Sequence, residues 1–244
     1  MTRSTSNIVL FLIGVMTVKM TWDGSFARYV AVGFRPYLAL TGIALIALAL
    51  SAMRQDLRRA ASNASHSHSH SDGVHWLLVC AVVVVAFVAP PPLSHSAVST
   101  IHTEFPAALE QQVFPPLPPG DAPEINLADA VSRAARDSTD SLVDREITVT
   151  GFIVRTSNGG APRSDGSTDG IDLARIRIIC CAADARTVRV HLATDTPQLP
   201  EGTWVRVRGV VDPQSSTPAT RFIPTLHVSD LTEIPAPDNQ YMPR

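Results

Sequence analysis

The sequence predicts an α-helical membrane region of about three transmembrane helices, followed by a mainly β domain outside the membrane. Two observations predict this organisation. Residues 1–92 are mostly apolar, whereas charged residues make up 17% of the whole chain of 244 residues. The later part alternates apolar and polar residues in short runs, a period that is typical of β-strands. We therefore expect a membrane region at 1–92, a proline-rich linker at 93–123 and a β domain with a leading amphipathic helix at 124–244.

Three apolar stretches make up the expected membrane region, at 7–22, 36–53 and 74–90. A helix that crosses the hydrocarbon core of a bilayer needs about 20 mostly apolar residues. The second and third stretches meet this requirement, and the first is marginal. A cleavable signal peptide is the alternative for the first stretch, since Arg3 precedes it, but no small-x-small cleavage site follows. We favour a retained helix.

The distribution of arginines predicts the orientation in the membrane. Arg3 precedes the first stretch, and no Lys or Arg follows the third stretch until Arg133. Because loops rich in Lys and Arg stay in the cytoplasm, the chain is expected to be a multi-pass plasma-membrane protein with an extracytoplasmic C-terminal domain. The loop between the second and third stretches carries Arg54, Arg58 and Arg59.

That cytoplasmic loop is rich in histidine at 64–75. Imidazole is a good ligand for zinc and other transition metals, so the loop is a candidate for weak, exchangeable metal capture. The alternative is a solvated polar loop in which histidine alternates with serine. The candidate metal ligands are His66, His68, His70 and His75.

The linker and the start of the outer domain have clear local patterns. Prolines between 93 and 123 favour an extended, stiff spacer. Asn126 is an expected N-cap of an amphipathic helix at 126–138. The residues expected on its apolar face are Leu127, Ala130, Val131 and Ala134.

Five short strands are expected after this helix. So many mostly alternating strands in about ninety residues predict a small closed or partly open barrel, with an OB-fold-like barrel as the leading candidate. Gly151 is expected to bend or bulge the first strand. The strands are expected at 146–155, 175–181, 187–193, 204–212 and 222–234.

Two of the three cysteines, Cys180 and Cys181, stand side by side where the second strand approaches a turn. Adjacent cysteines are poorly placed to bond each other, because the small ring strains the disulfide geometry. Alternation along the strand predicts that Cys180 lies over the core as a small buried side chain and that Cys181 lies near the outer face. Cys181 is therefore the better candidate for a ligating thiolate.

Further ligands for a metal ion at this turn are Asp184 or, through folding, His191 or His227. The third cysteine, Cys80, lies in an apolar run and is expected to be a buried membrane side chain. The chain has no Cys-x-x-Cys spacing, so neither thioredoxin chemistry nor a zinc ribbon is predicted.

The Cys-Cys-Ala-Ala-Asp-Ala motif at 180–185, the run WVRVRGVV at 204–211 and Tyr241 near the C-terminus resemble the YcgQ-like family of bacterial membrane proteins. That family is described as the accessory subunit of a two-component permease. The resemblance implies a polytopic permease subunit as partner, in a lipid bilayer, and leaves the solute unassigned.

Two classes of function remain open. The first is an accessory subunit that handles a transition metal such as zinc, or another small solute, beside the permease. The second is an interaction module that only docks on and stabilises the permease, with the cysteines packed in the core. An enzyme is not expected, because no Ser-His-Asp arrangement, paired carboxylates or phosphate loop is present. Nucleic acid is not an expected partner either, since aromatic residues for base stacking are scarce: Phe152, Trp204 and Phe222.

Overall fold

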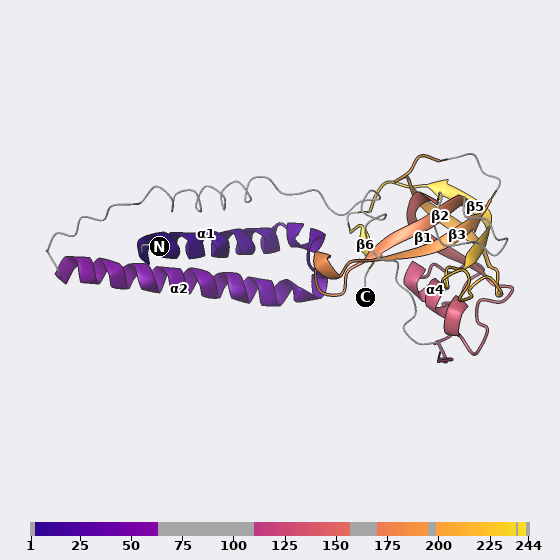
Figure 1. The fold of residues 1–244 in the computed structure, drawn as a ribbon, viewed down its shortest axis with the longest axis horizontal. Helices are drawn as coiled ribbons and strands as arrows, with labels where there is room; N and C mark the ends of the chain where they lie inside the picture. The colour runs from indigo at the N-terminus through magenta and orange to yellow at the C-terminus, as the bar shows by residue number, and fades with distance from the viewer. Residues whose placement is uncertain (1–2, 63–109, 157–169, 195–198, 238, 243–244) are drawn as a thin grey trace. The chain divides into compact units, whose positions relative to one another are not determined.

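The computed structural model describes residues 3–62, 110–156, 170–194, 199–237 and 239–242. The chain divides into two compact units, residues 1–92 and 93–244, and each is treated by itself. The first unit is helical where it is described, and the second is built mainly from strands (Figure 1).

The described part of the helical unit contains two α-helices, α1 (Arg3–Trp22) and α2 (Arg35–Ser62), which pack against each other in opposite directions. Glycines face each other at the contact: a Cβ atom on Gly14 would lie 3.0 Å from the backbone oxygen of Gly42. Near the other end of the pair, the Asn7 side chain donates a hydrogen bond to the Asp56 carboxylate over 2.9 Å. The two helices therefore form a close hairpin, joined through two short 3₁₀ turns.

Among the described residues, one helical segment, Val32–Arg58, is long and apolar enough to cross a membrane. The segment Ser6–Trp22 is apolar but shorter. The third expected stretch, at 74–90, lies outside the described residues. The second helix also runs nine residues beyond the expected end at 53, because its polar continuation is rich in residues with high helix propensity, such as Arg, Gln and Leu.

In the second unit, helix α4 (Leu127–Arg136) precedes the strands and confirms the expected amphipathic helix. Asn126 is its N-cap, and its side-chain oxygen accepts a hydrogen bond from the Ala128 backbone N–H over 3.0 Å. Three of the four residues expected on the apolar face are buried, and the fourth packs against the same core: Leu127, Ala130, Val131 and Ala134.

Six strands form one sheet, and the five long ones correspond to the five expected strands. Besides its pairing with β4, β1 also pairs with β2, so the order β1-β4-β5-β3-β2 returns to β1 and the pairings close into a ring. The pairing of β3 with β5 is parallel, and the other pairings of the ring are antiparallel. The strands are β1 (Glu146–Thr156), β2 (Gly170–Arg177), β3 (Arg186–Ala193), β4 (Trp204–Val211), β5 (Thr225–Glu233) and β6 (Tyr241–Met242).

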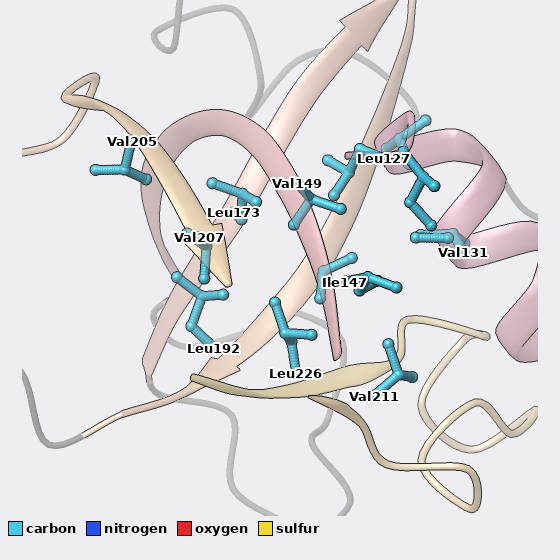
Figure 2. Packing of buried hydrophobic residues seen from close by; sticks show 14 of the residues in the cluster. Leu127, Val131, Ile147, Val149, Leu173, Leu192, Val205, Val207, Val211 and Leu226 are labelled. Atoms are coloured by element: carbon cyan, nitrogen blue, oxygen red, sulfur yellow. The ribbon is translucent and has the colours of Figure 1, made fainter. Parts of the chain in front are cut away.

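Alternate residues of the ring strands point inward and meet the apolar face of α4 (Figure 2). The side chains of Leu127 and Val131 from the helix pack in the same cluster as Ile147 of β1. Burial of this apolar surface is the main stabilising contribution to the unit. Further members of the cluster that Figure 2 labels are Val149, Leu173, Leu192, Val205, Val207, Val211 and Leu226.

Of the two expectations for Gly151, a bend or a bulge of the first strand, the bulge is not observed. Gly151 keeps regular register with β4, and a Cβ atom there would lie 2.7 Å from the Ala174 backbone oxygen, so close strand approach explains the glycine. The irregularity lies in β4, between Arg208 and Gly209. A Cβ atom on Gly209 would lie only 2.2 Å from the His227 backbone oxygen.

Chain segments from both ends of the unit complete the fold. The described part of the linker packs on the domain: Ile125 donates a backbone hydrogen bond to Thr148 of β1, and Gln112 donates one to Arg136 of α4. This part is therefore not a free spacer. Tyr241 is buried and its short strand pairs with β2, so the C-terminal segment packs on the sheet.

Candidate functional site

The hairpin of β2 and β3 carries the two adjacent cysteines in its turn. The two strands pair antiparallel up to Arg177 and Arg186, which are register partners at the base of the turn. Between them the chain leaves the sheet and forms a short 3₁₀ helix, Ala182–Asp184. The cysteines precede this helix, so they belong to the turn and not to the strand.

The Asp184 carboxylate holds the turn together by accepting hydrogen bonds from three successive backbone N–H groups. Its Oδ1 atom accepts from Ile179 over 2.8 Å, and its Oδ2 atom accepts from Cys180 over 2.8 Å and from Cys181 over 3.0 Å. The Cys180 thiol adds a fourth donor, with 2.6 Å between Sγ and Oδ2. A carboxylate with this many donors fixes the backbone that presents both sulfur atoms.

These contacts shift the pKa values of Asp184 and Cys180 in opposite directions. The hydrogen bond from the Cys180 thiol, together with the backbone N–H donors, holds the pKa of Asp184 well below its usual range, because each donor stabilises the charged carboxylate. The same hydrogen bond to Asp184, and the nearby Cys181, raise the pKa of the Cys180 thiol to about 11. Near neutral pH, Cys180 is therefore a neutral thiol beside an ionised carboxylate.

The two sulfur atoms lie 3.7 Å apart, and both cysteines are free. Together with one Asp184 oxygen, they form a group of three potential ligand atoms that all lie within 4.8 Å of one another. In a tetrahedral zinc site with zinc–sulfur distances of about 2.3 Å, two sulfur ligands lie about 3.8 Å from each other. The turn thus presents two sulfur atoms at a spacing that one metal ion can bridge once the thiols lose their protons.

The structure corrects the expected burial of Cys180. Cys180 is exposed, whereas Cys181 is half-buried. Alternation held as far as Ile178, which is buried, but strand β2 ends at Arg177 and the turn geometry decides the direction of the later side chains. The expectation that Cys180 packs in the core is therefore wrong, and both sulfur atoms are within reach of the surface.

Of the three further ligands expected from the sequence, the structure brings Asp184 to the cysteines. His191 is instead fully buried on β3, where its Nδ1 atom lies 2.7 Å from the Asp172 carboxylate. His227 is exposed on β5. Neither histidine is part of the three-ligand group at the turn. The candidate ligands of the histidine-rich loop lie outside the described residues: His66, His68, His70 and His75.

The role of Asp184 as the residue that holds the turn was missed in the sequence reasoning. The available indication was the residue type, since aspartate side chains often accept backbone hydrogen bonds in turns. The backbone N–H of Ile179, which contributes to this arrangement, carries no sequence information at all.

One known domain family is similar to the second unit, and the matched region begins within α4. Residues 130–244 match the DUF1980 C-terminal domain. The match to the DUF1980 C-terminal domain includes all six strands and the cysteine turn. No curated protein and no solved structure matches the chain. Residues 130–244 are therefore similar to this domain, and their chemistry is argued from their own side chains.

Proposed function

We propose that this chain is a membrane-attached accessory subunit that binds a transition-metal ion, with zinc as the first candidate, through Cys180 and Cys181. The observation that carries the proposal is the 3.7 Å separation of the two sulfur atoms on an exposed turn. Sulfur ligands favour soft and borderline ions such as Cu(I) and Zn(II). With two cysteines and at most one carboxylate oxygen, coordination positions stay open, so the ion can be received from and passed to other ligands.

The charges around the turn support binding of a metal–thiolate group. A divalent ion with two thiolates and one carboxylate carries one net negative charge. Arg177 and Arg186, at the base of the turn, provide positive charge close by in the chain. The Asp184 carboxylate oxygen Oδ1 accepts a single hydrogen bond from the described residues and keeps a lone pair that can reach the ion.

The membrane part of the proposal rests on the helical hairpin. Because α1 packs along α2 in the opposite direction, we infer that both helices cross the membrane when α2 does. Close backbone contact at Gly14 and Gly42 is typical of helix pairs in membranes, where small residues let helices approach. With the third apolar stretch at 74–90, the positive-inside distribution of arginines favours an extracytoplasmic β domain.

The fold of that domain is, in our proposal, an OB-fold-like barrel. The ring of pairings β1-β2-β3-β5-β4 supports it, since a five-stranded barrel of this kind closes its first strand on two partners. The partner in our proposal is a polytopic permease subunit, on the basis of the resemblance carried by the motif at 180–185. The metal site on an exposed turn suits delivery to such a partner.

One observation favours an alternative, in which the domain is an interaction module that only docks on the permease. The Asp184 carboxylate already accepts four hydrogen bonds within the turn, which is sufficient to explain its presence as a structural residue. In that case the motif shapes a docking surface and the cysteines take no part in binding a metal.

Zinc titration of the full-length chain tests the proposal. The four histidines of the loop at 64–75 are replaced by alanine in all samples, because they form a second candidate site for zinc. We expect one zinc ion per chain, much weaker zinc binding in Cys180→Ser and Cys181→Ser, and unchanged binding in the matched control Cys80→Ser. Equal binding by all variants would remove the thiols from the site and contradict the proposal.

Co-purification with the permease separates the two functions. If the metal proposal holds, the double variant Cys180→Ser/Cys181→Ser keeps its association with the permease but loses metal-dependent transport. If the domain is only an interaction module, the double variant keeps both, and removal of the β domain abolishes the association.

A further inference from the structure

A second candidate site lies in the same unit, in a polar cavity of about 430 Å³ at the C-terminal end of α4. Four chain segments line it: the described linker near Gln111, the last turn of α4, the following turn from Ser138 to Val143, and the loop after β4 near Pro213. No residue of the cysteine turn lines this cavity. It is therefore a separate site.

Arg133, the first charged residue in the cavity wall, has its guanidinium group paired within the protein. Its side chain is 5% exposed, and its Nε atom lies 2.9 Å from the Asp129 carboxylate. Its Nη1 atom donates to the Ser141 hydroxyl over 3.0 Å, and its guanidinium lies 5.0 Å from the centroid of the Phe114 ring. Arg133 thus stabilises the wall and offers little to a ligand.

The Asp137 carboxylate is also hydrogen-bonded within the cavity wall. It accepts hydrogen bonds from the backbone N–H and the hydroxyl of both Thr139 and Ser141. Burial by itself would raise the pKa of Asp137, but the hydrogen bonds from Ser141 and Thr139 outweigh it and lower the pKa to about 2. Its negative charge is permanent near neutral pH and is balanced within the wall.

Arg136 differs from Arg133 and Asp137 in the pairing of its side chain. Its backbone oxygen accepts a hydrogen bond from Gln112 over 2.8 Å, which fixes the residue in place. Its guanidinium, however, has no ion-pair or hydrogen-bond partner among the described residues, and its Nε atom is buried without an acceptor. A partly buried cation with unmet donors is costly, and an anionic ligand relieves that cost.

We propose that this cavity binds a small organic monocarboxylate, whose carboxylate pairs with the Arg136 guanidinium. Guanidinium and carboxylate groups match each other in shape and form two parallel hydrogen bonds. One unpaired cation suits one negative charge, and Asp140 in the lining opposes a dianion such as phosphate. The hydrocarbon part of the ligand meets the apolar lining residues Ala135, Leu142 and Val211.

Calorimetric titration of the full-length chain in detergent tests this inference, with butyrate and benzoate as probes and inorganic phosphate as comparison. We expect saturable binding of at least one carboxylate with a Kd of about 1 mM or tighter. Arg136→Gln should weaken it at least tenfold, and Arg136→Lys should retain part of the affinity. Arg206→Gln, an exposed arginine on β4 of the same unit, is the matched control and should bind as the unchanged chain does.

Three results would overturn the inference: no saturable carboxylate binding by the unchanged chain, equal affinity in Arg136→Gln, or tighter binding of phosphate than of both carboxylates. Circular dichroism and the melting temperature show whether each variant folds. If Arg136→Gln does not fold, the comparison of Arg136→Lys with the unchanged chain decides, and equal affinity then counts against the inference.

Discussion

The Cys180 thiol donates a hydrogen bond to the Asp184 carboxylate, with 2.6 Å between Sγ and Oδ2. This contact raises the pKa of Cys180 to about 11 and keeps Asp184 ionised. The exposed cysteine therefore carries its proton near neutral pH. A metal ion has to displace this proton, and accidental alkylation or oxidation is suppressed because the thiolate is the reactive form.

Replacing the carboxylate should make Cys180 more reactive. In a chain whose Cys80 and Cys181 are serine, Asp184→Asn removes the negative charge beside the thiol and lowers its pKa. We expect alkylation of Cys180 by iodoacetamide at pH 7.5 to become roughly tenfold faster, because a larger thiolate fraction outweighs its lower nucleophilicity. The control is Asp230→Asn, an exposed aspartate on β5. An unchanged or slower rate in Asp184→Asn would show that the carboxylate does not hold the proton.

The affinity of the turn for zinc should rise with pH. Cys180 is protonated below its pKa of about 11, so each binding event between pH 6 and 8 releases the proton of this group. Cys180 alone then contributes about a tenfold increase in affinity for each pH unit. Titrations of the histidine-free chain at several pH values measure the slope. Cys180→Ser should lose this one unit of slope, and an identical slope in that variant would exclude Cys180 as a ligand.

The sequence predicted which residues make up the candidate metal site, but not how their side chains are placed. The residue types and their spacing indicated Cys180, Cys181 and Asp184, and the structure brings these three together. Sequence alternation could not give their exposure, because it applies only within a strand, and β2 ends at Arg177. The direction of both thiols is instead set by backbone N–H groups that bind Asp184, and backbone groups are the same for every residue type except proline.

Gly209 should be essential to the stability of the β unit. A Cβ atom there would lie 2.2 Å from the backbone oxygen of His227 on the paired strand, and backbone atoms in a ladder have little freedom to move away. We expect Gly209→Ala to lower the free energy of unfolding by more than about 3 kcal/mol. Thermal unfolding followed by circular dichroism measures it, with Arg206→Ala on the exposed face of the same strand as control. A melting temperature equal to that of the control would contradict the strand contact.

The strands themselves were predictable because alternation between apolar and polar residues follows directly from one-sided burial. The start of β2 was not predictable in this way. Gly170 belongs to a stretch of Ser, Gly and Asp that is typical of a loop, yet it begins the strand, and Asp172 is fully buried beside His191. The closure of β1 on β2 and the parallel pairing of β3 with β5 depend on contacts between segments that are distant in the chain, and no local pattern encodes them.

The helix hairpin should depend on the contact of its two glycines. A Cβ atom on Gly42 would lie 2.8 Å from the Val18 side chain and 3.2 Å from the Gly14 backbone oxygen. Gly42→Val should therefore weaken the packing by about 1–3 kcal/mol. Disulfide crosslinking between Asn7→Cys and Asp56→Cys, in a chain without its own cysteines, reports the association. We expect a lower yield in Gly42→Val and no change in Ala44→Val, which is exposed on α2; equal yields would refute the contact.

X-ray absorption of the zinc-loaded full-length chain tests the central claim most directly. The loop histidines are replaced by alanine, so that any remaining zinc reports the cysteine turn. The account predicts two sulfur atoms at about 2.3 Å from the zinc, completed by oxygen ligands, and loss of one sulfur in Cys180→Ser or Cys181→Ser. A spectrum with only nitrogen or oxygen ligands at about 2.0–2.2 Å would contradict it.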